Sequence, residues 1–226
     1  MATPARSAAD FLPARLTLPA LQRAAAACRG CELYRRATQT VFGEGPRRAR
    51  LVLVGEQPGD KEDIAGRPFV GPAGLLLNRA LDQAGIPRDA VYVTNAVKHF
   101  KWTARGKRRL HQRPREGEID ACRPWLEAEV HVLKPAAVVC LGATAARAVY
   151  GKAVRIKDLR GGATASPLSA LTYVTVHPAA MLRLIDGMER ERAFVQFVGE
   201  LATVWRAISS KPRKNPQQNA GSRPAL

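Results

Sequence analysis

The chain alternates short apolar runs with helical patterns, and this alternation constrains its fold more than any other feature. The apolar runs are Leu51–Gly55, Ala90–Asn95, Ala136–Gly142 and Leu171–His177. Each ends in Gly, Asn or His, which is typical of buried strands that stop at a turn. Helical patterns between the runs cover Gly74–Ala84, Ile119–Leu133 and Ala143–Tyr150. This order predicts a three-layer α/β/α fold around a central, mostly parallel four-stranded sheet.

The chain is long enough for one folded domain with a loose segment at each end. Its 226 residues suit a single compact core. We expect residues 1–17 to form a flexible N-terminus and residues 18–208 to form the domain. Helices over Leu18–Ala27 and from about Arg190 to Ile208 begin and end it. Residues 209–226 are rich in Pro, Asn, Gln and Lys, so they predict a disordered basic tail.

The charge balance points to a polyanionic partner. The chain has 36 Lys and Arg against 19 Asp and Glu, a net charge of +17 at neutral pH. Nucleic acid is the expected partner, and an acidic membrane surface is the competing one. The sequence has no run of about 18 apolar residues and no secretory signal pattern. We therefore expect a soluble cytoplasmic protein without a membrane partner.

Basic residues are concentrated between residues 98 and 115. Eight Lys and Arg fall in this segment, with Phe100, Trp102 and His111 among them. Phosphate binding is the economical explanation, although a solvated loop or a localisation signal has the same composition. The interleaved aromatic side chains favour a single strand, whose bases are free to stack.

Three chemically distinct side chains follow the predicted strands. Glu56 comes directly after the first strand, Asn95 ends the second and His177 ends the fourth. Loops at the carboxyl ends of parallel strands converge on one edge of the sheet, where ligands bind. A carboxylate, an amide and an imidazole are therefore expected together. Individually they also suit a solvated loop acid, a turn-forming Asn and a structural His before Pro.

Four cysteines are spaced as a possible metal-ligand set. Cys28 and Cys31 form a Cys-x-x-Cys pair, and 17 residues separate Cys122 from Cys140. A disulfide framework is not expected in a reducing compartment, which leaves ordinary buried thiols or metal ligands. Ligands from widely separated segments fit an iron-sulfur centre better than zinc, although thiolate softness suits both metals.

Four motifs resemble those of family 4 uracil-DNA glycosylases. They are Gly-Glu-Gln-Pro-Gly-Asp at residues 55–60, Gly-Arg-Pro-Phe-Val-Gly at 66–71, Thr-Asn-Ala-Val-Lys at 94–98 and His-Pro-Ala-Ala-Met-Leu-Arg at 177–183. The cysteines are similar to that family's [4Fe-4S] ligands in order and approximate spacing. The resemblance extends from about residue 25 to residue 205.

The resemblance implies a uracil-DNA glycosylase-like fold and a DNA-repair activity. Residues 18–208 would form the catalytic domain, with a [4Fe-4S] cluster as its cofactor. Its metal ligands would be Cys28, Cys31, Cys122 and Cys140. The expected partner is uracil-containing DNA, preferentially single-stranded, bound by a monomer that associates with the nucleoid.

Two departures from the family pattern indicate the UdgX subgroup. Gln57 replaces the Ala that is usual after Gly-Glu, and an insertion carries Lys107, Arg108, Arg109, Leu110 and His111. Members of that subgroup stay attached to uracil-containing DNA through the histidine of a Lys-Arg-Arg-Ile-His loop. Here Leu stands in place of Ile, which is a minor change.

The resemblance assigns roles that suit cleavage of an N-glycosidic bond, in which the leaving base becomes negative and the sugar positive. His177 would donate a hydrogen bond to uracil O2. Asn95 would read N3–H and O4, because the amino group of cytosine would face a donor there. Phe69 would stack on the flipped base. Glu56 would stabilise the sugar cation and accept a proton.

Further residues would complete the base pocket and the DNA surface. Gly55, Gln57 and Asp60 border the uracil site, with Gln57 shaping the pocket and holding Glu56. The expected DNA-binding residues are Lys107, Arg108, Arg109, Met181 and Arg183. Met181 and Leu182 could wedge into the vacated base position, or be buried in the core.

His111 carries the most specific hypothesis. Its neutral imidazole could capture the anomeric C1′ in place of water, with Glu56 accepting its proton, so that the bond persists. A loop histidine among arginines is otherwise more often a phosphate contact. The alternatives are a conventional family 4 enzyme that releases abasic DNA with turnover, and a non-catalytic single-strand binder.

Overall fold

A mostly parallel sheet forms the centre of the computed structural model, which describes residues 7–210. Its strand order is β2-β1-β5-β7-β6. The strands are β1 (Leu51–Gly55), β2 (Val91–Asn95), β5 (Ala137–Leu141), β6 (Thr164–Ser166) and β7 (Ser169–Thr175). All neighbouring pairs are parallel except β6 and β7. The prediction of a mostly parallel sheet is confirmed.

The sheet has five strands where the sequence predicted four. The additional strand, β6, has only three residues and pairs antiparallel with β7 at one edge. Its Thr-Ala-Ser sequence contains no apolar run, because an edge strand is not buried on both faces. The hydrophobic pattern that reveals the four longer strands therefore could not reveal this one.

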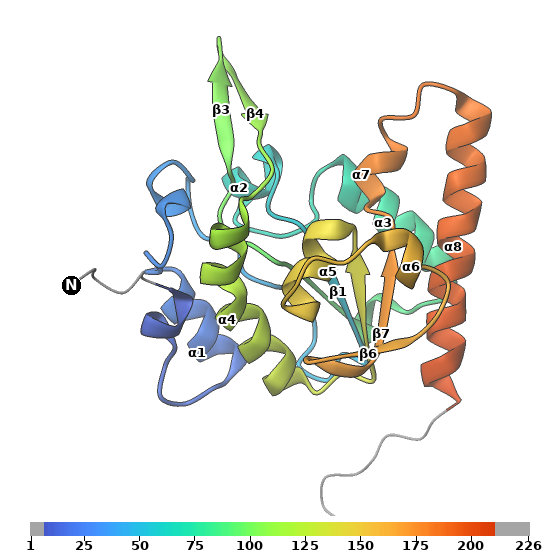
Figure 1. Cartoon of the computed structure of the whole chain (residues 1–226), viewed down its shortest axis with the longest axis horizontal. Coiled ribbons are helices and arrows are strands. Elements are labelled where there is room, and N and C mark those ends of the chain that lie inside the picture. Colours follow the sequence, from blue (N-terminus) through green and yellow to red (C-terminus); the bar gives the residue numbers. More distant parts are fainter. Residues whose placement is uncertain (1–6, 211–226) are drawn as a thin grey trace, which may run out of the picture.

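Helices cover both faces of the sheet, as a three-layer fold requires (Figure 1). The α-helices are α1 (Leu18–Ala25), α2 (Asp60–Ala65), α3 (Pro72–Gln83), α4 (Glu116–Leu133), α5 (Ala143–Tyr150), α6 (Ile156–Leu159), α7 (Pro178–Met181) and α8 (Gly187–Ser209). Short 3-10 helices are η1 (Ala8–Phe11), η2 (Glu32–Arg35) and η3 (Arg88–Ala90). One core includes residues of α1, α4 and α5, and the other includes residues of α3 and α8.

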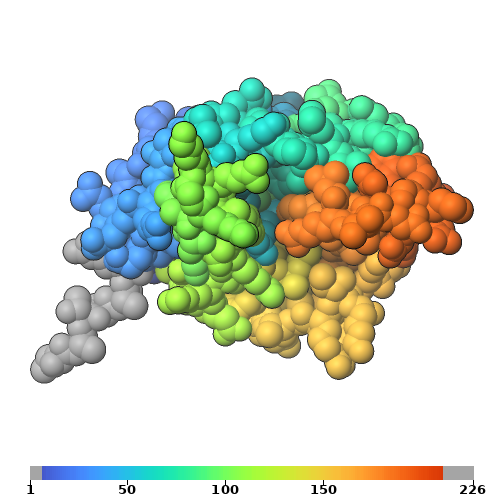
Figure 2. Space-filling model, turned by 90° about the horizontal axis from the view of Figure 1, so that it is seen from above, coloured from blue at the N-terminus to red at the C-terminus, as the bar shows by residue number. Residues whose placement is uncertain are grey.

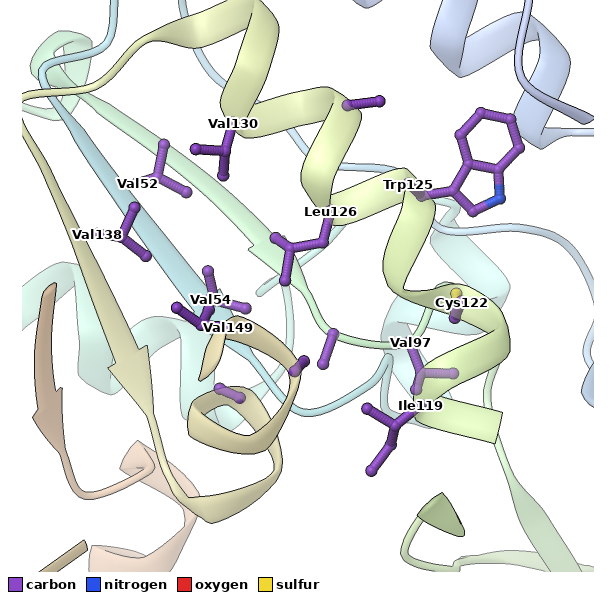
Figure 3. Close-up of a cluster of buried hydrophobic side chains, with 14 of the residues drawn as sticks. Val52, Val54, Val97, Ile119, Cys122, Trp125, Leu126, Val130, Val138 and Val149 are labelled. Atoms are coloured by element: carbon purple, nitrogen blue, oxygen red, sulfur yellow. The ribbon is translucent and has the colours of Figure 1, made fainter. Parts of the chain in front are cut away.

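Alternate residues of one strand belong to opposite cores. Val52 and Val54 of β1 lie in the core under α4 and α5, while Leu51 and Leu53 lie in the core under α3 and α8. Figure 3 shows the two valines on the face of the sheet that α4 covers, with Val130 and Leu126 of α4 in the same cluster. All five residues of β1 are buried, which explains their continuous apolar sequence. The sheet is thus a packed platform for the loops at its carboxyl edge.

The basic segment after Lys98 forms a two-stranded antiparallel hairpin separate from the main sheet. Its strands are β3 (Trp102–Arg105) and β4 (Arg108–His111), and Trp102 pairs with His111. Gly106 adopts a left-handed conformation, with φ of 57°, at the turn. The hairpin projects beyond the carboxyl edge of the sheet (Figure 1).

The predicted end segments lie partly outside the described residues. The first six residues of the expected flexible N-terminus, 1–6, and most of the expected tail, 211–226, lie outside the described residues. Within the expected N-terminus, η1 packs against α4 and buries Ala8. No helix between residues 7 and 210 is long and apolar enough to cross a bilayer.

A buried ion pair joins the carboxyl end of β2 to α4. Lys98 Nζ lies 2.6 Å from Glu129 Oε2, and the two side chains are 1% and 0% exposed. The ammonium also donates to Thr94 Oγ1 and to the backbone oxygen of Asn95. Glu129 accepts a further hydrogen bond from the Tyr92 hydroxyl. Both charges are therefore compensated within the core.

Glu129→Gln should destabilise the fold by about 3–5 kcal/mol, because it leaves the Lys98 ammonium buried without a countercharge. The matched control is Glu127→Gln on the same helix, which removes a half-exposed partner of Arg123 and should cost about 0–1 kcal/mol. Urea unfolding of both variants measures the difference. Equal midpoints for the two variants would contradict the expectation.

Candidate active site at the carboxyl edge of the sheet

Glu56 lies at the centre of the carboxyl edge, directly after β1. Thr144, at the start of α5, donates its hydroxyl to Glu56 Oε2 at 2.5 Å. The other carboxylate oxygen, Oε1, lies 3.3 Å from His111 Nε2 of the hairpin. The side chain is 24% exposed, so it is held by partners but still faces the open edge.

His177 caps α7 and is held in one tautomer. Its Nδ1 accepts a hydrogen bond from the Ala179 backbone at 3.1 Å, which leaves the ring proton on Nε2. Burial lowers the pKa of His177 to about 4; the Glu56 charge opposes this shift, and His111 and Arg183 add to it. The ring is therefore a neutral hydrogen-bond donor at physiological pH.

Asn95 and Phe69 converge above Gly55. A Cβ atom on Gly55 would lie 2.4 Å from Asn95 Oδ1 and 2.7 Å from Phe69 Cζ, so only glycine leaves room for both. Asn95 is 3% exposed and pairs with Gly55 across the strands. The Phe69 ring stacks on His177, with centroids 6.3 Å apart and planes at 24°. A carboxylate, an amide, an imidazole and an aromatic ring thus share one edge.

The backbone of Phe69 is held in an uncommon conformation. Its φ is 57°, the left-handed region that residues other than glycine rarely adopt. A Cβ on Gly74 would lie 1.7 Å from the Phe69 carbonyl oxygen. The Phe69 loop thus packs directly against the backbone of α3 at Gly74, where a side chain would not fit. Glu62 stabilises the loop by accepting the backbone N–H groups of Gly59 and Gly71. Sequence reasoning did not identify Gly74, because glycine in a helix carries no signal of such a contact.

Gln57 binds the hairpin, and within residues 7–210 its side chain makes no hydrogen bond to Glu56. Its amide nitrogen donates to the backbone oxygens of Lys101 and Gln112 at 3.2 and 3.1 Å. Its oxygen accepts the Lys101 backbone N–H at 3.2 Å. One side chain thus fastens both strands at the base of the hairpin, a role that the sequence did not reveal.

His111 reaches Glu56 from the hairpin. Burial lowers its pKa, and this effect is opposed by the charge of Glu56 and reinforced by that of Arg183. The ring is tilted against Phe100, with centroids 6.1 Å apart. Figure 2 shows the hairpin, in light green, across a hollow from the orange segment that contains α7. His111 of the hairpin and His177 at the start of α7 both lie close enough to Glu56 for its charge to raise their pKa values against the effect of burial.

Arg109 and Asp60, which were expected to bind DNA and uracil, are paired with each other. Arg109 Nε lies 2.5 Å from Asp60 Oδ1, and Nη1 lies 2.6 Å from Asp63 Oδ2. Asp63 is wholly buried, whereas the Arg109 side chain is 21% exposed. The guanidinium is thus used mainly to hold the hairpin.

The other expected DNA-binding residues divide between surface and core. Lys107, Arg108 and Arg183 are exposed. Met181 is only 2% exposed and packs in the core, so it is not available as a wedge in this structure. Leu182 is 41% exposed and Ile185, a few residues later, is 97% exposed. These two are the apolar side chains that the loop presents to solvent beside the hollow.

Three of the four cysteines gather between the N-terminal segment and α4. Burial is the main cause that raises the pKa of the Cys122 thiol; Lys98 lowers it, and the thiols of Cys31 and Cys28 add to the rise. Cys122 Sγ accepts the Lys98 backbone N–H, and Cys28 Sγ accepts the indole N–H of Trp125, both at 3.3 Å. Sulfurs that accept such bonds suit metal-bound thiolates.

Cys140 does not fit the expected ligand set. It lies within β5, paired with Val54 and Val174 on its two sides, and burial alone raises its pKa. Among residues 7–210, no group of three or more His, Cys, Asp and Glu side chains is arranged to hold a single metal ion. Spacing alone grouped Cys140 with the other thiols, although its place within the apolar run Ala136–Gly142 is typical of a core residue.

His99 shares a cavity with Cys28 and was not identified from the sequence. The volume of this cavity is about 210 Å³. Its Nε2 is 2.8 Å from Thr40 Oγ1. Burial lowers its pKa to about 4, although Asp63 opposes the shift, so the ring is neutral. Its place directly after the Thr-Asn-Ala-Val-Lys motif is the sequence signal that could have indicated it.

Comparison with known proteins adds an independent observation. A model of the uracil DNA glycosylase superfamily matches residues 42–202. The chain is 36% identical over 186 residues to the type-4 uracil-DNA glycosylase of Thermotoga maritima, which covers 76% of this chain and 91% of that protein. It is 35% identical over 163 residues to the type-4 uracil-DNA glycosylases of Pyrobaculum aerophilum and Sulfurisphaera tokodaii, covering 69% of this chain and 80% and 71% of theirs.

Proposed function

The chain belongs to the uracil-DNA glycosylase superfamily, and we propose that it excises uracil from DNA and then bonds covalently to the product through His111. The observation that carries the second half of this proposal is the 3.3 Å separation of His111 Nε2 and Glu56 Oε1. It puts a neutral nucleophile beside the carboxylate that faces the sugar. The proposed subgroup is UdgX.

Recognition of uracil is assigned to the pocket above Gly55. The flipped base stacks on Phe69, and the Asn95 amide accepts from N3–H and donates to O4. Cytosine presents an amino group at position 4, so two donors would then face each other in a buried site. The 3% exposure of Asn95 makes such a mismatch costly.

Cleavage breaks the bond between uracil N1 and C1′, and both electrons leave with the base. His177 Nε2–H donates to uracil O2, where negative charge develops, and Glu56 stabilises the positive charge on the sugar. Nδ1 of His177 is already engaged by the Ala179 N–H, so the donor needs no reorientation during the reaction. This arrangement is electrostatic and requires no covalent intermediate on His177.

Capture follows when His111 Nε2 bonds to C1′. Glu56 takes the Nε2 proton, which frees the electron pair of the broken N–H bond; this pair forms the bond to C1′ and leaves a neutral alkylated imidazole. The proton then passes from Glu56 to N1 of the uracil anion, and this step restores the carboxylate. Water, which would attack C1′ in an enzyme that turns over, is replaced by the imidazole.

The DNA path is proposed to follow the hollow between the hairpin and the α7–α8 segment. Lys107, Arg108 and Arg183 supply phosphate contacts on its two sides. Leu182 and Ile185 supply the apolar wedge for the vacated base position. We propose that a monomer binds single-stranded DNA preferentially and associates with the nucleoid through this DNA binding.

Mixing the protein with uracil-containing single-stranded DNA should give one retarded band that survives heat and SDS on a denaturing gel. The covalent bond explains its persistence. A control DNA with thymine in place of uracil should give none. Free abasic product in excess of protein would instead identify a conventional enzyme with turnover, and binding without release of uracil would identify a non-catalytic binder.

His111→Ser should abolish the band while uracil release continues, because Glu56, Asn95 and His177 are untouched. Released uracil should then exceed the amount of protein, since water replaces the imidazole at C1′. Arg105→Ser, at the exposed end of the hairpin, is the matched control and should keep the band. Loss of uracil release in His111→Ser would contradict the assigned roles.

Capture by His111 should persist to a lower pH than capture by a histidine with an unperturbed pKa would. An unperturbed imidazole is half protonated at about pH 6.5, and burial lowers the pKa of His111. The rate of adduct formation should therefore be more than half-maximal at pH 6.5 and fall at lower pH, because the imidazolium form is not a nucleophile. The rate of adduct formation, relative to uracil release in the same reaction, measures this. A half-maximal rate at pH 6.5 would contradict it.

We further propose that the cofactor is a [4Fe-4S] cluster held by Cys28, Cys31, Cys122 and His99. The thiols of Cys31 and Cys28 lie close enough to Cys122 to raise its pKa, and Cys28 and His99 line one cavity. Both observations support this set. When bound, the cluster would cross-link the N-terminal segment to α4, and no step of the reaction is assigned to it. Cys140 is left out of the proposed set because it lies within β5 and is not among the thiols that act on the pKa of Cys122.

Iron content separates the two ligand sets. The purified protein should be brown and carry about four irons per chain, the count that defines the cluster. Cys122→Ser and His99→Ala should lose iron and visible absorbance, whereas Cys140→Ala should retain both. Loss of iron in Cys140→Ala, with retention in His99→Ala, would restore the four-cysteine set.

A further inference from the structure

Residues 36–40, which we call the brace segment, contact the hairpin that carries His111. Trp102 Nε1 of β3 donates to the backbone oxygen of Arg36 at 2.8 Å. The Arg36 guanidinium also covers the Trp102 ring, 4.6 Å from its centroid. A tryptophan on an exposed hairpin is thereby fixed to a segment far away in the sequence.

The second hairpin strand is fixed to the same segment through Arg109. Its guanidinium lies 5.6 Å from the centroid of Trp102. Nη1 donates to Thr38 Oγ1 at 3.1 Å and to Asp63 at 2.6 Å. Asp63 in turn accepts the backbone N–H and the hydroxyl of Thr38. The brace segment thus contacts β3 through Trp102 and β4 through Arg109.

This attachment bears directly on His111. Trp102 is the residue paired with His111 across the hairpin, so movement of one strand displaces the other. Within residues 7–210, the His111 ring has Glu56 as its polar partner, with 3.3 Å between Nε2 and Oε1. The position of the imidazole therefore depends on the hairpin, which Gln57 fastens at its base and the brace segment fastens along one side.

The base pocket does not depend on the indole contacts of Trp102 in this way. Asn95 and Gly55 belong to strands of the central sheet, and His177 is held by its bond to Ala179. Phe69 is held by the loop that Glu62 closes. Loss of the Trp102 indole contacts can therefore shift His111 and leave these side chains in place, because α2 keeps its own bonds to Thr38 and Gln39.

We propose that Trp102 is a positioning residue that determines whether C1′ is captured by His111 or by water. This inference rests on the proposed function. Reacting atoms must approach closely, and a displacement of about 1 Å is enough to change a rate by about 100-fold. Without the indole anchor, the imidazole leaves its place and water gains access to the sugar cation.

The test compares Trp102→Phe and Trp102→Ala under single-turnover conditions on uracil-containing single-stranded DNA. Trp102→Phe keeps an aromatic ring for both guanidinium groups but loses the N–H. The ratio of adduct to free abasic DNA should fall about 10-fold in Trp102→Phe and about 100-fold in Trp102→Ala. The rate of uracil release should stay within about threefold, because the pocket is unchanged. Trp205→Phe on α8 is the matched control and should keep the native ratio.

Hydrogen exchange provides a readout that does not depend on the chemistry. Amides of residues 102–111 should exchange faster in Trp102→Phe, while those of the central sheet keep their protection. An unchanged product ratio, or a parallel fall in uracil release and capture, would overturn the proposal. Failure of the unsubstituted protein to form any adduct would instead overturn the proposed function, which is tested first. If Trp102→Ala does not fold, the Trp102→Phe result decides.

Discussion

The buried pair of Lys98 and Glu129 is the interaction on which the carboxyl edge depends. Its ammonium binds the backbone oxygen of Asn95, so the charge that stabilises α4 against the sheet also fixes the end of β2. The backbone N–H of the same lysine contacts Cys122, and Glu129 accepts the backbone N–H of Gly43. One compensated ion pair therefore connects the base pocket, the three gathered cysteines and the N-terminal half of the chain. Because uncompensated charge in a core is so costly, these parts cannot move independently without penalty.

The site combines parts that are held in different ways. Asn95 and Gly55 are set by strands packed on both faces, and His177 is set by the backbone of α7. His111 is carried by a hairpin that contacts the body through side chains: Gln57 at its base, and Trp102 and Arg109 along its side. Sheet positions are rigid because they are buried, whereas a hairpin attached by a few polar contacts opens more readily. Recognition of the base and capture of the sugar are therefore separable in structural terms.

Sequence reasoning predicted the parts of the site that follow from periodicity. Strand ends placed Glu56, Asn95 and His177 at one edge, because parallel strands share a direction. The partners of Gln57 and Arg109 could not be predicted, since they arise from contacts between segments about 50 residues apart. Spacing likewise grouped Cys140 with the other thiols, although its position inside an apolar strand already indicated a core residue. Met181 is buried and Leu182 is exposed. The sequence could not predict which of the two faces solvent, because they are adjacent apolar residues at the end of a one-turn helix.

The place of His111 beside Glu56 has a consequence for how the protein would be used in a cell. Under the proposed function, the nucleophile is part of the chain and is consumed with each lesion, so the molecule acts as a stoichiometric reagent. Its capacity is then set by the number of copies synthesised and not by a turnover rate. Every uracil that it meets remains marked by a bulky protein of 226 residues, and clearing that mark falls to whatever machinery degrades or removes such cross-links.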